Sequence, residues 1–226
     1  MMNAYRTTVA TLALLVVGAM SAEAQERVHH FQVAVGGGWH SFAGGSAVKG
    51  GATISGEATY YLTPSLGVGL WTDYTFTETD GARFPPAALS FVDSTTFTII
   101  SQPLDIWQYG AHAKLQMGGS LGPFLLVGAG GYTVFLDPQQ ASGSELSTGL
   151  VFRLGAGLDL AVTDRAGFQI AVFDAFFPDW KPNRLYPVRD QFQNTRFPEL
   201  NPDPDDLDDA VHNLGLTVAV TVVSGG

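Results

Sequence analysis

The feature that most constrains the fold of this 226-residue chain is a two-residue period in its apolar side chains. Such a period is typical of β-strands, whose successive side chains point to opposite faces. The alternation is clearest over residues 31–39, 52–60, 66–76, 107–117, 150–160, 168–172 and 213–222. An eighth segment, 123–136, is apolar on both faces. The sequence therefore predicts eight strands and leaves the orientation of segment 123–136 open.

The connections between these segments alternate in length. Tight turns are centred on residues 63–65, 118–120 and 163–165, whereas the other connections are longer. In an antiparallel sheet this places every tight turn at one end and every long loop at the other. The segments run about 10 to 13 residues, the length that a tilted strand needs to cross a bilayer. We predict an all-β fold, an eight-stranded antiparallel up-and-down transmembrane β-barrel with both termini on the periplasmic side.

The two faces of the strands predict the inside and the outside of this barrel. A sheet in hydrocarbon must close on itself, because every backbone polar group has to be satisfied internally. The apolar face is then expected to meet lipid, and the polar, glycine-rich face to line a narrow lumen. Aromatic side chains near the strand ends predict two interfacial girdles. The expected members are Tyr60, Phe124 and Phe168 at the turn end, and Trp39, Tyr74, Phe76, Trp107, Tyr109 and Phe152 at the loop end.

The first 24 residues have the features of a secretory signal peptide. Arg6 precedes an apolar run over residues 9–20, and Ala22-Glu23-Ala24 matches a small-residue cleavage site. The run is too short to span a bilayer comfortably. We expect cleavage after residue 24, a mature barrel over residues 25–226, and a location in the outer membrane of a Gram-negative bacterium.

Composition excludes several classes of function. The chain has 11 basic and 21 acidic residues, a net charge of −10, which argues against a nucleic-acid partner. It has no cysteine, which excludes a disulfide scaffold, a thiolate zinc site and a cysteine nucleophile. The glycines of residues 128–131 precede a strand-like stretch instead of a helix, so a nucleotide-binding loop is not expected. We expect no cofactor.

Four stretches, YGAHAKLQ, GPFLLVGAGGYTVFL, FRLGAGLDLAV and HNLGLTVAVTV, read like transmembrane strands of small outer-membrane barrels. The chain resembles the eight-stranded family typified by the OmpA membrane domain and OmpX. The resemblance implies insertion by the barrel-insertion machinery and contact with outer-membrane lipid and lipopolysaccharide. Family members usually end on an aromatic residue, whereas this chain ends Val222-Val223-Ser224-Gly225-Gly226. The chain has no room for a peptidoglycan-binding domain, so that tethering role is not expected.

Several charged residues fall on the predicted lumen face. Unpaired charges in a confined lumen are costly, so we expect ion pairs. The hypothesis is that Glu57 pairs with Lys114 and Asp73 with Arg153, plugging the lumen. The complete predicted interior network is Glu57, Asp73, His112, Lys114, Arg153 and Asp159. A satisfied polar core is favoured over a charge gate for small solutes.

An acidic segment precedes the last strand. The spacing of its oxygen-bearing residues is similar to the ligand spacing of a calcium loop. The candidate ligands are Asn201, Asp203, Asp205 and Asp209. Asp206 stands where such a loop needs glycine and His212 where it needs glutamate, so a solvated acidic loop is favoured over a firm metal site.

Two long loops, residues 78–103 and 177–210, are candidates for binding a surface ligand. Aromatic and basic residues are interleaved in the second, which favours either recognition or packing on the barrel rim. The signatures of enzymatic barrels are missing, including the His-x-Ser-Asn motif of lipid A deacylases. We therefore expect a non-enzymatic barrel with a structural or surface-interaction role. The alternatives are a narrow channel for small solutes and a soluble periplasmic barrel of lipocalin type, whose interior would be apolar.

Overall fold

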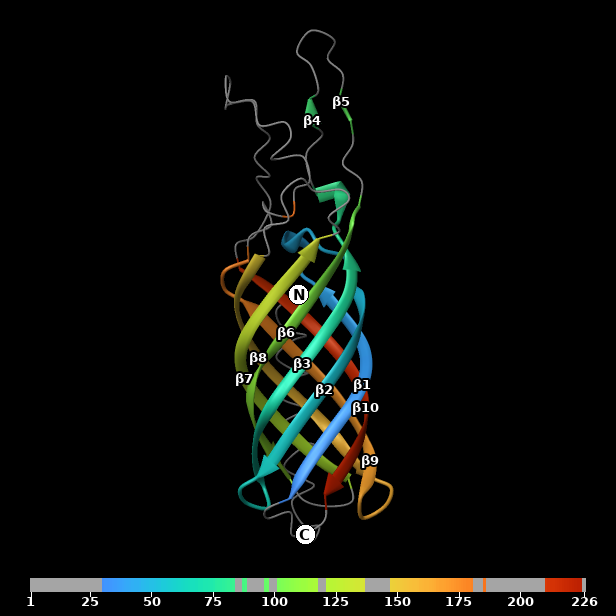
Figure 1. The fold of residues 1–226 in the computed structure, drawn as a ribbon, viewed down its shortest axis with the longest axis vertical. Coiled ribbons are helices and arrows are strands. Elements are labelled where there is room, and N and C mark those ends of the chain that lie inside the picture. The colour runs from blue at the N-terminus through green and yellow to red at the C-terminus, as the bar shows by residue number, and fades with distance from the viewer. Residues whose placement is uncertain are drawn as a thin grey trace, which may run out of the picture.

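A computed structural model of the chain describes residues 30–83, 87–88, 96–97, 101–117, 121–136, 147–180, 185 and 210–224. These residues form a barrel of tilted strands, and the short turns at residues 62–65 and 162–165 lie at the same end of it (Figure 1). The predicted signal peptide, residues 1–24, lies outside the described residues. No helix within the described ranges has the length and apolar composition needed to cross a bilayer.

In the described part of the chain, eight strands close the barrel in the order β1-β10-β9-β8-β7-β6-β3-β2. Every pairing is antiparallel, which confirms the predicted up-and-down fold. The strands are β1 Phe31–Phe42, β2 Gly51–Tyr61, β3 Leu66–Glu78, β6 Pro103–Gln116, β7 Leu121–Leu136, β8 Ser147–Ala161, β9 Ala166–Phe177 and β10 Val211–Ser224. Between β3 and β6, β4 Ala87–Ala88 and β5 Thr96–Phe97 form a separate two-stranded sheet.

The predicted inward and outward faces are those of the structure. On β10, for example, Leu214, Leu216 and Val218 are exposed, whereas the intervening Asn213 and Thr217 are buried. The outer wall is therefore an apolar surface, and the lumen is lined largely by polar and small residues, as a membrane barrel requires.

The orientation of β7, which its sequence left open, is settled by its register. Leu125 and Val127 are exposed on the outer wall, and the even-numbered Phe124, Leu126 and Tyr132 are buried inside. The strand is apolar on both faces because its inner side chains pack in the lumen, and Tyr132 belongs to an apolar cluster at the loop end.

One member of the predicted aromatic girdles is assigned wrongly. Phe124 points into the lumen with only 2% of its surface exposed. The Lys114 ammonium nitrogen lies over the Phe124 ring, 4.1 Å from the ring centroid. The ring therefore contacts a buried cation inside the barrel instead of the lipid headgroups expected for a girdle residue. The remaining girdle residues are exposed on the outer wall, except for Tyr74, which is half-buried.

Glycine lets the wall bend where β1 meets β10. A Cβ atom on Gly36 would lie 2.5 Å from Ala219 Cα, and one on Gly38 would lie 2.8 Å from Thr217 Cα. Real Cβ atoms do not approach so closely, so side chains at these positions would push the two strands apart. The glycines of β1 therefore permit the tight curvature of a small barrel.

Candidate functional site

The lumen holds the densest arrangement of charged side chains in the described structure. Lys114 on β6 is completely buried, and its Nζ lies 3.2 Å from Glu57 Oε1 on β2. The same ammonium lies 3.3 Å from Asp159 Oδ2 on β8. One cation therefore connects two carboxylates from opposite parts of the wall. We call these three residues the Lys114 cluster.

Neutral groups complete the shell of the Lys114 cluster. Lys114 Nζ donates to Gln169 Oε1 at 3.4 Å and to Gln32 Oε1 at 3.5 Å. The hydroxyl of Tyr61, the last residue of β2, donates to the same Gln32 oxygen at 2.7 Å. Together with the Phe124 ring, these contacts fill the lumen towards the turn end.

A second ion pair lies in the same lumen. Arg153 Nη1 on β8 lies 3.1 Å from Asp73 Oδ2 on β3, and both side chains are buried. The guanidinium lies over the Phe173 ring, 3.7 Å from its centroid, and 4.9 Å from the Trp71 ring. Stacking on two aromatic rings holds the guanidinium in place and excludes solvent from the pair.

The ion pairs expected from the sequence, Glu57–Lys114 and Asp73–Arg153, are therefore both present. Asp159 joins the first pair, and His112 lies beside it. His112 Nε2 is 2.9 Å from the Thr59 hydroxyl and 3.8 Å from Glu57 Oε1. All six predicted interior residues thus face the lumen.

A third polar group, which the sequence interpretation missed, surrounds His40. This histidine is completely buried, and its Nδ1 lies 3.1 Å from both the Thr75 hydroxyl and Asn213 Nδ2. The His40 ring meets the Phe173 ring edge-on, with 5.1 Å between the ring centroids. Because the Arg153 guanidinium stacks on the same Phe173 ring, His40 is in contact with the second ion pair through this ring. The inward register of β1 could have revealed His40, because it has the same parity as Gln32 and Ala34.

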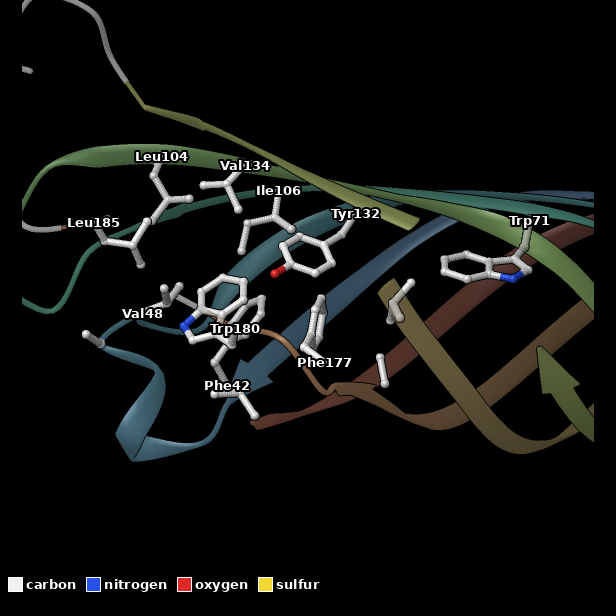
Figure 2. Packing of buried hydrophobic residues seen from close by; sticks show 14 residues of the cluster. Phe42, Val48, Trp71, Leu104, Ile106, Tyr132, Val134, Phe177, Trp180 and Leu185 are labelled. Atoms are coloured by element: carbon white, nitrogen blue, oxygen red, sulfur yellow. The ribbon is translucent and has the colours of Figure 1, made fainter. Parts of the chain in front are cut away.

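Towards the loop end, a group of aromatic side chains fills the barrel mouth (Figure 2). Phe42, Tyr132, Phe177 and Trp180 are all buried, and we call them the aromatic plug. Ring centroids are 5.0 Å apart for Tyr132 and Phe177, and 5.5 Å for Phe177 and Trp180. Phe42 stacks on Trp180 at 6.3 Å. The plug is apolar and close-packed, unlike the Lys114 cluster and the Asp73–Arg153 pair, which lie deeper in the lumen.

The plug includes the start of the second long loop. Trp180 Nε1 donates a 3.0 Å hydrogen bond to the Ser46 carbonyl, and the Tyr132 hydroxyl donates a 2.7 Å bond to the Asp179 carbonyl. Leu185 is also buried in the surrounding cluster. The chain that follows β9 is therefore fixed into the mouth before the loop continues.

An exposed ion pair lies outside the membrane-spanning segments. In the loop between β1 and β2, Lys49 Nζ lies 2.6 Å from Glu78 Oε1. The hydrogen bond that the Lys49 ammonium donates to the Glu78 carboxylate raises the pKa of Lys49. The raised pKa stabilises the folded state at pH values below the pKa of lysine in the unfolded chain. This stabilisation is lost as the pH rises through the pKa of Lys49 in the folded protein. Because both side chains are over 40% exposed, solvent screening keeps the effect small.

The acidic segment lies beyond what the structure describes. Asn201, Asp203, Asp205 and Asp209 are outside the described residues, as are most of the loop residues between 78 and 103 and between 177 and 210. Among the described residues, no group of three or more His, Asp or Glu side chains is arranged to hold a metal ion. The calcium-loop hypothesis therefore stays a sequence prediction.

A closed barrel with an apolar outer wall, a filled lumen and long connections at one end defines the class of small outer-membrane barrels. The model of the outer membrane protein beta-barrel domain family matches residues 10–173, more than half of the chain. The chain belongs to this family and is located in the outer membrane of a Gram-negative bacterium.

Two solved structures share the fold. Neisserial surface protein A (NspA) is 14% identical, with a TM-score of 0.53 over 85% of this chain and 96% of that one. The outer membrane protein OprG from Pseudomonas aeruginosa is 13% identical, with a TM-score of 0.52 over 88% of this chain and 97% of that one. No curated protein is significantly similar in sequence.

The soluble lipocalin-type alternative is wrong. It required an apolar interior and a polar exterior, whereas Leu70, Leu154 and Val218 are exposed on the outer wall and Lys114 and Arg153 are buried inside. The arrangement of faces is that of a membrane barrel.

Proposed function

We propose that this protein is a non-enzymatic, non-conducting outer-membrane barrel whose biological role is carried by its long extracellular loops. The observation that supports this proposal most directly is the filling of the lumen at two levels. The aromatic plug occupies the mouth, and the Lys114 cluster occupies the lumen nearer the turns. A solute would have to displace close-packed rings and separate a buried cation from two carboxylates.

The anchoring of the second loop supports a role at the surface. Residues 177–210 begin with Phe177 and Trp180 fixed in the plug, so a rigid scaffold holds the base of this loop. Binding residues are often carried by loops that a rigid scaffold positions. The proposed partners are a surface ligand contacted by loops 78–103 and 177–210, lipopolysaccharide and membrane lipid around the wall, and the barrel-insertion machinery during assembly.

Planar-bilayer recording tests the closed lumen. The purified protein is expected to show no single-channel steps, because both levels of the lumen are filled. Glu57→Gln should be equally silent, since the plug remains. Regular steps in the wild-type protein, with a conductance that Glu57→Gln changes, would contradict the proposal and favour the narrow channel.

Loop excision tests the surface role. Replacing residues 187–206 with a short Gly-Ser linker keeps Trp180 and Leu185, so the barrel should fold and shift on gels after boiling. Whole cells carrying this variant should lose binding to immobilised host matrix proteins that the wild-type cells bind. Equal binding by both strains would argue that the second loop is not the recognition surface.

A further inference from the structure

A hollow lies within the apolar surface of the outer wall. A depression of about 670 Å³ lies across β3, β6, β7 and β8. Its membrane-facing lining consists of Val68, Leu70, Ala111, Ala113, Val127, Ala129 and Phe152. All are apolar, so their side chains offer water no hydrogen-bonding partner. The depression therefore belongs to the lipid-facing surface.

Strand register explains the shape of this depression. Leu70, Ala111, Ala129 and Phe152 form one row across the four strands. Leu70 is 66% exposed and Phe152 is 48% exposed, so both stand out from the wall as ridges. The two alanines between them form a floor that reaches barely beyond the backbone.

The floor is kept thin from the inside as well. A Cβ atom on Gly69 would lie 2.9 Å from His112 Cε1, and one on Gly128 would lie 3.1 Å from Trp71 Nε1. The buried side chains of the lumen therefore occupy the space where inward side chains of these two glycines would lie. At this level the wall carries only alanine methyl groups on its outer side at Ala111 and Ala129, and no side chain on its inner side at Gly69 and Gly128.

Aromatic side chains mark the end of the depression that faces the loops. The Tyr109 hydroxyl lies 3.2 Å from where a Cβ atom on Gly131 would stand, so this ring covers the glycine. Trp107 packs on Tyr109 at 4.7 Å, and its Nε1 donates to the Thr72 hydroxyl at 2.8 Å. Amphipathic rings of this kind sit at the level of lipid headgroups.

We propose that the depression seats one acyl chain of an outer-leaflet lipid. The inference deepens the lipid contact proposed above and does not depend on what the loops bind. The seat is continuous with the membrane-facing wall, so lipid chains are the molecules that already surround it. A chain would lie on Ala111 and Ala129, between Leu70 and Phe152, with its headgroup beyond Tyr109.

The width of the seat favours a lipid chain over a second barrel. Leu70 and Phe152 are three strand spacings apart, roughly 14 Å between backbones. An extended hydrocarbon chain fits within this span and can bend to follow the alanine floor, whereas the wall of another barrel is rigid and convex.

The test is lipid retention through purification. The protein is extracted from outer membranes in a mild detergent, washed extensively, and examined by native mass spectrometry. The wild-type barrel is expected to retain one lipid, whose mass tells a phospholipid from lipid A. Ala129→Phe fills the floor and should lower the retained fraction about tenfold, because packing contacts drive association in a membrane.

A matched variant controls for the added ring. Ala156→Phe places the same side chain on the outer wall of β8, at a residue that does not line the depression. It should retain lipid like the wild type. Both variants should move to the outer membrane and shift on gels after boiling, so a failure of insertion is distinguished from a loss of lipid.

Three outcomes would overturn the proposal. The first is a wild-type barrel that carries no lipid after the wash. The second is equal retention by wild type and Ala129→Phe. The third is a wild-type dimer that Ala129→Phe converts to a monomer, which would assign the depression to a second copy of the chain.

Discussion

Lys114→Met is expected to lower the free energy of unfolding by about 3–5 kcal/mol, the usual cost of removing one partner from a buried ion pair. The substitution leaves the Glu57 and Asp159 carboxylates in the lumen without their shared cation. Methionine has nearly the shape of lysine, so lost packing contributes little. Urea unfolding in lipid vesicles, followed by the boiling-dependent gel shift, measures the effect.

Two controls separate charge burial from a general effect of losing a lysine. Lys49→Met removes an exposed ion pair that solvent screens, so it should change stability far less than Lys114→Met does. Combining Lys114→Met with Glu57→Gln and Asp159→Asn removes all three charges and should recover most of the loss. A Lys114→Met barrel as stable as Lys49→Met would show that the cluster is not a stabilising contact.

Trp180→Ala is expected to cost about 3–5 kcal/mol, as deletions of large buried aromatic side chains do. It removes the ring that packs on Phe42 and Phe177, together with the hydrogen bond to Ser46. The base of the second loop should then be released from the mouth. Protease treatment of whole cells should cut this loop several times faster than in the wild type.

Trp180→Phe is the matched variant, because it keeps one aromatic ring in the plug while it removes the indole hydrogen bond and part of the ring volume. It should cost about 1–3 kcal/mol, less than Trp180→Ala, and change loop cleavage less. In planar bilayers Trp180→Ala should remain closed, since the Lys114 cluster is intact. Equal cleavage rates for Trp180→Ala and the wild type would argue against anchoring by this residue.

The charged part of the candidate site could be predicted from the sequence, because parity along a strand decides which side chains share the lumen. Glu57, Lys114, Asp73 and Arg153 all have inward parity, and burial of unlike charges forces them to pair. The sequence could not assign Asp159 to the Lys114 cluster. That assignment depends on which strands face each other across the barrel.

The aromatic plug was beyond sequence interpretation for a related reason. Phe42, Tyr132 and Phe177 lie at the loop ends of β1, β7 and β9, far apart along the chain, and Trp180 lies in a loop that has no period. Its position near a strand end predicts a girdle role for Phe124, but strand-end position does not distinguish the two faces of β7. Its partner Lys114, on the neighbouring β6, determines the face.

By itself the sequence determined that this chain crosses the outer membrane as eight antiparallel strands, and which side of most strands meets lipid. Period and loop length are local properties, and hydrocarbon leaves a sheet no alternative to closure. Only the tertiary structure decided how the lumen is filled, which way β7 faces, and where the outer wall is hollowed. Those features depend on register and curvature, which bring together side chains that no local pattern connects.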